Sequence, residues 1–200
     1  MTGLALSLLM AAALGVAPKP ADPQAIGRLG DLSGNDLPSV RDGVVFANVA
    51  LDFMGTPMGC TVVKSGSRWL DLRTCAGLMR LRYVPARDEA GVPVASVYST
   101  AVRWSTGGYG SPGYLVDETV EVGKLPAGAA QPVVAVRQVI DPDGSVESCE
   151  VDQGSGVAGL DRLACGQAEG LGKLGPVKDR SGKPVRTLRV SHIQFAQKAG

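Results

Sequence analysis

The feature that most constrains this 200-residue chain is an internal repeat built around its four cysteines. In each half a glycine lies five residues before a cysteine, a Leu-Asp pair and a second cysteine follow, and a large aromatic residue ends the match. The offset between partners grows only from 89 to 91 residues, which indicates a duplication. The matched positions are Gly55 and Gly144, Cys60 and Cys149, Leu70 and Leu160, Asp71 and Asp161, Cys75 and Cys165, and Trp104 and Phe195.

Each repeat has the pattern of two strands, a helix and a third strand. In the second repeat, the apolar and β-branched run 133–140 leads into Asp141-Pro142-Asp143-Gly144, a turn in which Pro presets φ and Gly accepts a positive φ. We expect a return strand over 145–151, a helix over 160–171 and a third strand over 185–195. Gly166 and Gly170 should shorten or fray that helix.

The first repeat predicts the same order, with strands over 44–53, 58–63 and 94–104 and a helix over 69–82. The predicted fold class is therefore α+β, as two tandem β-β-α-β units, each a small antiparallel sheet with one helix packed on it. Trp69 and Trp104 are expected in the core or at a strand end rather than on a ligand surface.

The cysteines fall on the second strand and on the helix of each unit. Disulfides Cys60–Cys75 and Cys149–Cys165 would staple each helix to its sheet, a constraint of about 3 kcal/mol in the chain-entropy model. Small units of this size need such help. A zinc site and free buried thiols remain alternatives, although close Cys pairs are lacking and His192 is the only histidine.

The N-terminal run Leu4–Ala17 is apolar and uncharged, which is typical of a secretory signal peptide. A retained anchor and a buried helix remain alternatives, but the run is shorter than the ~20 residues of a membrane-spanning helix, so no stable membrane span is expected. The predicted organisation is a signal peptide at 1–17, a linker at 18–34, the first unit at 35–104, a Gly/Pro-rich linker at 105–124 and the second unit at 125–197.

Composition and spacing give no support for nucleic-acid binding or catalysis. Lys and Arg number 20 against 19 Asp and Glu, a net charge of +1. His192 and Ser191 are adjacent in a predicted strand and so point to opposite faces, which excludes a nucleophile and base pair and leaves an exposed histidine. Asp141 and Asp143 are too close for a calcium loop. We expect no enzyme activity, no cofactor and no metal.

The repeat resembles the C-terminal domain of the TonB family of energy transducers, in the subgroup that pairs a strand cysteine with a helix cysteine. The first unit carries Pro-Ala-Arg-Asp at 85–88, then Gly91, Pro93-Val94 and the terminal Trp104. The second keeps Asp-x-x-Gly-x-Pro-Val at 179–185, with Phe195 in place of the Trp. The resemblance is closer in the first unit.

This resemblance implies a periplasmic or secreted module that binds a protein or peptide, with an outer-membrane transporter segment as the suspected partner in energy-dependent uptake. The family adds a short peptide as a strand on the edge of its last strand. The candidate edges here are the third strands at 94–104 and 185–195, and the partner-binding edge implied in the first is Val97, Tyr98, Ser99, Thr100, Ala101 and Val102. The alternative is a structural envelope protein whose two units pack together without transporter binding, for instance by pairing these strands with each other.

A short linker separates the apolar run from the first unit. Its ~17 residues reach at most about 3.6 Å each, too short to cross a wide compartment. A free module is therefore expected rather than a force-transmitting transducer anchored in the inner membrane.

Overall fold

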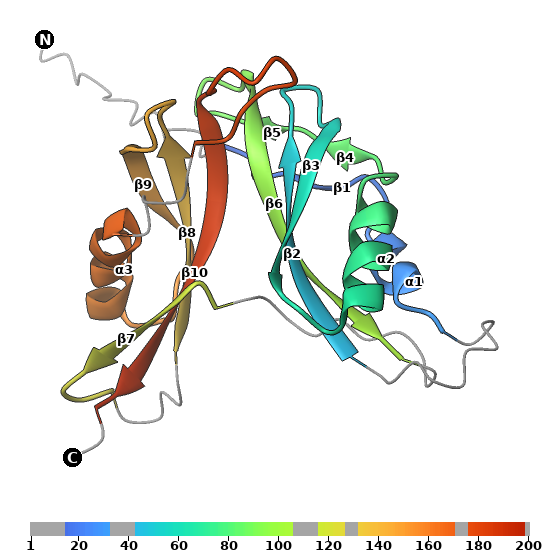
Figure 1. The fold of residues 1–200 in the computed structure, drawn as a ribbon. Helices are drawn as coiled ribbons and strands as arrows, with labels where there is room; N and C mark the ends of the chain where they lie inside the picture. The colour runs from blue at the N-terminus through green and yellow to red at the C-terminus, as the bar shows by residue number, and fades with distance from the viewer. Residues whose placement is uncertain (1–14, 33–42, 106–115, 127–131, 171–175, 199–200) are drawn as a thin grey trace, which may run out of the picture.

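Eight strands of the described chain form one mixed β-sheet (Figure 1). The computed structural model describes residues 15–32, 43–105, 116–126, 132–170 and 176–198. The main path of the sheet runs in the order β3-β2-β6-β10-β8-β9, with β5 paired to β6 and β7 paired to β10. The bounds are β2 (Gly43–Leu51), β3 (Pro57–Lys64), β5 (Ala86–Arg87), β6 (Pro93–Trp104), β7 (Glu118–Val122), β8 (Val133–Ile140), β9 (Val146–Gln153) and β10 (Thr187–Gln197).

The two halves of the chain meet in the middle of this sheet. β2 and β3 form one antiparallel hairpin and β8 and β9 form the other, while β6 and β10 return antiparallel to β2 and β8. β6 and β10 then pair with each other in parallel, Ala95 with Thr187, Ser96 with Leu188 and Val97 with Arg189. The α+β class is as predicted, but the sheet is mixed and shared rather than two separate antiparallel sheets, because pairing these edges satisfies backbone groups that would otherwise face solvent.

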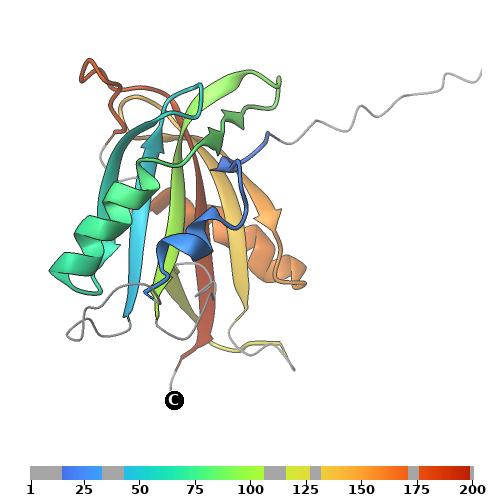
Figure 2. The ribbon, with the colours of Figure 1, turned by 90° about the vertical axis from the view of Figure 1, so that its right-hand side faces the viewer.

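The two longer helices lie on opposite faces of the sheet (Figure 2). α2 (Arg68–Leu78) packs on β2 and β3 with α1 (Ala25–Leu29) beside it, whereas α3 (Ala158–Gly170) packs on β8 and β9. Partners in register point to the same face. Tyr98 shares the α2 face with Val49, whereas Val97 shares the opposite face with Arg189. The α2 face of the first half is thus continuous with the uncovered face of the second half.

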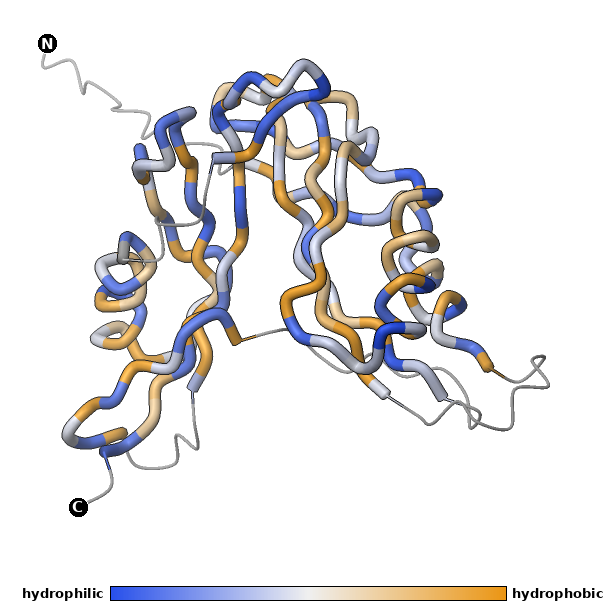
Figure 3. Tube along the Cα trace, viewed as in Figure 1, coloured by the Kyte–Doolittle hydropathy of each residue, from blue (hydrophilic) through white to orange (hydrophobic). Residues whose placement is uncertain are grey.

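Each helix closes an apolar core against its own hairpin. Along β2, every second residue is buried beneath α2, and apolar and polar stretches alternate along the strands of both halves (Figure 3). Trp104 is buried in the first core, where its indole N–H donates to Thr74 Oγ1 at 2.8 Å and its ring lies edge-on to Trp69 at 5.9 Å. Both tryptophans are packing residues, as predicted. The second core is formed by Val134, Val136, Leu160, Ala164, Ala168, Ile193 and Phe195.

Both hairpins turn at the glycines that the repeat aligns. Gly55 and Gly144 have φ of +79° and +91°, and each backbone N–H donates to an aspartate carbonyl, that of Asp52 or Asp141, at 2.9 Å. The Asp143 carboxylate accepts from the Ser145 N–H at 2.9 Å, so it is used within the turn. The prediction of a turn at 141–144 is confirmed.

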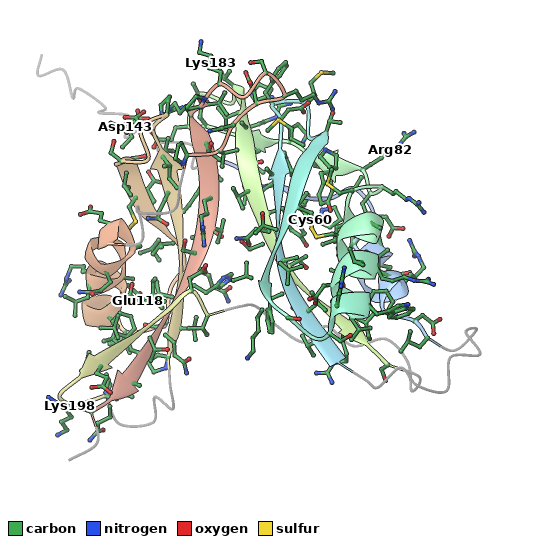
Figure 4. All side chains as sticks on the ribbon, viewed as in Figure 1. Cys60, Arg82, Glu118, Asp143, Lys183 and Lys198 are labelled. Atoms are coloured by element: carbon green, nitrogen blue, oxygen red, sulfur yellow. A yellow bond between two sulfur atoms is a disulfide. The ribbon has the colours of Figure 1, made fainter. Side chains whose placement is uncertain are left out.

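The disulfides tie the outermost strands of the sheet to the helices. Cys60 on β3 is bonded to Cys75 on α2, and Cys149 on β9 is bonded to Cys165 on α3 (Figure 4). These are the partners that the repeat predicts, and the zinc and free-thiol alternatives are wrong. No membrane-spanning helix occurs among the residues that the structure describes.

The second predicted helix is longer than expected and the first is shorter. α3 has 13 residues and α2 has 11. The glycine penalty at Gly166 is offset by packing, since Ala164 and Ala168 on the inner face of α3 are fully buried. α2 ends at Leu78, four residues before the predicted end at residue 82, and Tyr83–Val84 then forms the short strand β4.

Both predicted linkers contain ordered elements. Within 18–34, β1 (Lys19–Pro20) pairs with β4, and Ile26 and Leu29 of α1 pack against the first core. Within 105–124, β7 pairs with β10. These segments are short and weakly periodic, so neither leaves a pattern that sequence reading detects. Of the predicted signal peptide, residues 1–14 lie outside the described residues, while Val16 exchanges backbone hydrogen bonds with Arg87.

Removing one disulfide should destabilise the protein without changing its fold. The bonds close loops of 15 and 16 residues, so the double serine variant Cys60→Ser/Cys75→Ser should lose about 3 kcal/mol, or about 6 to 12 °C in Tm. Cys149→Ser/Cys165→Ser is the matched control and should lose about the same amount. Thermal unfolding measures both, and a thiol assay should find no free thiol before reduction. An unchanged Tm would contradict this account.

Candidate functional site

β6 is the strand from which the predicted binding edge would be built. On one side it pairs with β2 along Ser96–Trp104. It also pairs with β5 at Pro93 and Val94. On the side away from β2 it pairs with β10 at Ala95–Val97. Val97 therefore already has a strand on both sides. Tyr98–Val102 pair with no second strand among the residues that the structure describes, so this is the part of the predicted edge where an added strand would fit.

The side chains of Tyr98–Val102 are half-buried or buried in the structure. Ala101 is 3% exposed and Val102 is fully buried. The Tyr98 ring lies 5.4 Å from that of Tyr83, whose hydroxyl donates to the Leu78 carbonyl at 3.0 Å. Burial raises the pKa of both phenols, so both stay neutral. A backbone held this firmly is suited to binding through main-chain hydrogen bonds.

A cleft of about 410 Å³ lies on the face of the first half that α2 leaves uncovered. Asn48, Ala50 and Val97 line one side of it, and residues 176–178 line the other. Asn48 pairs in register with Ser99, and both the Asn48 side-chain oxygen and the Ser99 hydroxyl are buried without a hydrogen-bond partner. The cleft therefore combines apolar walls with an acceptor that is not satisfied from within the protein.

The equivalent edge of β10 is occupied. β10 pairs with β8 along Thr187–Gln194, and its other side pairs first with β6 and then with β7, Ile193–Gln197 against Glu118–Val122. The two third strands thus differ: β10 has neighbours along nearly its whole length, and β6 has a stretch of five residues without a second neighbour among the described residues.

A buried polar network holds the second half together, and sequence reading missed it. The Arg189 guanidinium, 5% exposed, bonds to the Asp117 carboxylate and donates to Ser191 Oγ. Ser191 donates to Gln138, whose amide donates to the Ala168 carbonyl of α3 at 2.8 Å. The one available signal was an arginine and a glutamine inside otherwise apolar strands, which indicates buried partners.

The other candidate residues have structural surroundings. Asp71 and Asp161 lie in the first turns of α2 and α3, as predicted, and accept from Ser65 and Ser155 of the preceding loops. The prediction of an exposed His192 is wrong. Its side chain is 21% exposed, and its Nδ1 lies 3.9 Å from the Asp117 carboxylate. Among the described residues, no three His, Cys, Asp or Glu side chains are grouped so as to hold a metal ion.

Comparison with known proteins bears on the second half of the chain. Residues 128–196 match the family model of the Gram-negative bacterial TonB protein C-terminal. No curated protein and no solved structure matches the chain. The matched residues contain β8, β9, α3 and nearly all of β10. This match supports a TonB-like protein-interaction module, and it falls on the half whose motifs are less complete.

The half-buried His192 should make stability fall with acidification. Burial lowers its pKa below the ordinary 6.5, an effect that Asp117 and Asp152 oppose. Because the unfolded chain then binds the proton more readily, the stabilising contribution is complete above pH 6.5 and declines as the pH falls through and below that value. His192→Gln should show a smaller loss of Tm between pH 7.5 and 5.5 than the wild-type protein. An identical loss would contradict the assignment.

Proposed function

We propose that this chain is a periplasmic protein-binding module of two TonB C-terminal-like units, which binds an extended segment of an outer-membrane transporter by strand addition. The observation that carries the proposal is the side of β6 at Tyr98–Val102 that has no second strand among the described residues, in a chain whose second half matches the TonB family model. An added strand would extend the pairing that β10 begins at Ala95–Val97.

Two repeated units are supported by the arrangement of equivalent parts. Both halves contain a hairpin, a helix and a long third strand in the same order, and each disulfide joins the second strand to the helix. The sheet order reads outward from β6 and β10 as third strand, first strand and second strand on either side. This is the arrangement expected of two copies related by an approximate two-fold axis along the strands.

A periplasmic location is supported by the two disulfides, which persist in oxidising compartments. The apolar run Leu4–Ala17 would direct export as a signal peptide.

Main-chain hydrogen bonds would supply affinity at β6, and the adjacent cleft would supply selectivity. Side chains on alternate positions of an added strand would point to the same face as Asn48 and Val97, where the cleft lies. A residue that donates a hydrogen bond there would satisfy the Asn48 side-chain oxygen.

The alternative is a structural envelope protein. It is favoured by the β6–β10 pairing, which uses part of the same edges to join the two halves. On this alternative the sheet is complete as it stands, and Tyr98–Val102 bind no partner.

The two functions are distinguished by hydrogen exchange with candidate peptides. Peptides captured from envelope extract, or taken from transporter N-termini, should slow exchange at residues 98–102 by at least about tenfold. Alternate backbone amides of an added strand face β6 and donate to it. N-methylation of the peptide at these alternate positions should therefore abolish binding, and N-methylation at the positions between them is the matched control. No protection at peptide concentrations near 1 mM would favour the structural function.

A further inference from the structure

The edge of β10 is closed by a strand from the same chain. β7 runs parallel to β10 over five consecutive pairs, from Ile193 with Glu118 to Gln197 with Val122. Its side chains are exposed or half-buried, and Val120 and Val122 pack against the second core. β7 therefore lies on the side of β10 that corresponds to the free side of β6, and it begins where the equivalent of Tyr98–Val102 ends, since Ile193 aligns with Val102 in the repeat.

One residue fixes the start of β7. The Asp117 carboxylate bonds to the buried Arg189 guanidinium and also accepts from the His192 backbone N–H at 2.8 Å. The Asp117 N–H donates to the His192 carbonyl at 2.9 Å, and at the other end the Lys198 N–H donates to the Val122 carbonyl at 2.9 Å. Both side chains of the ion pair are under 10% exposed, 7% for Arg189 and 6% for Asp117.

Among the described residues, the first half has only the beginning of such a strand. Asp31 forms a single parallel bridge with Ser105, the equivalent of the Glu121–Ala196 pair 90 residues later. There the Leu32 N–H donates to the Ser105 carbonyl at 3.3 Å and the Ser105 N–H to the Gly30 carbonyl at 3.0 Å. The same edge is therefore covered over five residues in the second half and bridged at one position in the first.

We propose that β7 is an internal occupant of the β10 edge, and that this edge accepts a strand from another protein only when β7 leaves. Removal of β7 would leave the Arg189 cation buried without its carboxylate, which is strongly unfavourable. The incoming segment must therefore carry a carboxylate at the position of Asp117, and a segment that copies the pairing of β7 runs parallel to β10. The inference concerns β10 alone and does not depend on binding at β6.

The test releases β7 and supplies it again as a peptide. In Asp117→Ala/Val120→Pro the Tm should fall by about 10 °C, because the ion pair and the strand pairing are both lost. A peptide of residues 116–123 should bind this variant and recover most of the Tm loss. The same peptide with Asn at the position of Asp117 should bind at least tenfold more weakly, and the wild-type protein should bind the acidic peptide at least 100-fold more weakly than the variant does.

Glu121→Ala is the matched control, because Glu121 lies on β7 but is exposed and outside the Asp117 network. This variant should have the Tm of the wild-type protein and should bind the acidic peptide as weakly as the wild-type protein does. A folded double variant that fails to bind the acidic peptide would overturn the proposal, as would equal binding by the wild-type protein.

Hydrogen exchange of the wild-type protein tests the proposal if the double variant does not fold. The β10 amides that face β7 should exchange together with those of β7, through a local opening that leaves the amides of β8 protected. Exchange of all three strands only on global unfolding would overturn the proposal. Binding of a peptide at β6 is measured by hydrogen exchange of residues 98–102, and release of β7 by exchange of β7 and β10. The failure of one proposal can therefore be distinguished from the failure of the other.

Discussion

The parallel pairing of β6 with β10 is the constraint on which the rest of the structure depends. It spans only Ala95–Val97 and Thr187–Arg189, yet it turns two hairpins into one sheet. Because equivalent strands pair side by side and in the same direction, the second half is turned over relative to the first. α2 and α3 consequently lie on opposite faces, and each half leaves one face of its strands uncovered by a long helix. The cleft beside Asn48 lies on one of these uncovered faces.

The unpaired backbone groups of a sheet edge can pair with another chain, and this fold covers or uses its edges in several ways. The outermost strands, β3 and β9, are bonded to helices through Cys60 and Cys149. The inner edges are used to join the halves and, at β10, to bind β7. Among the described residues, the side of β6 from Tyr98 to Trp104, which contains Tyr98–Val102, is then the longest inner stretch without a second strand. This concentration of pairing elsewhere is what makes that stretch a reasonable place for a partner.

Most of the predictions that the structure bears out came from the internal sequence repeat. Aligned glycines located both hairpin turns, and aligned cysteines selected one disulfide pairing out of three, because local sequence governs turns and short loops. Contacts between the halves left no such signal. Strand partners and register depend on tertiary packing, so Val97 was expected at a free edge although it pairs with Arg189. The ordered segments at α1 and β7 were too short for periodicity to reveal, and Asp117 gave no sign that it would meet a cation distant in sequence.

The divergence of the two third strands follows from the sequences that precede each hairpin. Before β8, Asp117 supplies a carboxylate to Arg189, and the alternating side chains of β7 place Val120 and Val122 against the second core. Before β2, the described chain folds instead into α1, whose Ile26 and Leu29 pack against the first core, and after α1 it forms one strand bridge among the described residues, at Ser105 just after β6. Two halves with the same order of elements and equivalent disulfides thus have unlike edges. Because Arg189 is buried, the carboxylate requirement that we propose applies to the β10 edge whatever strand occupies it, whereas at β6 the cleft beside Asn48 would select the partner that we propose.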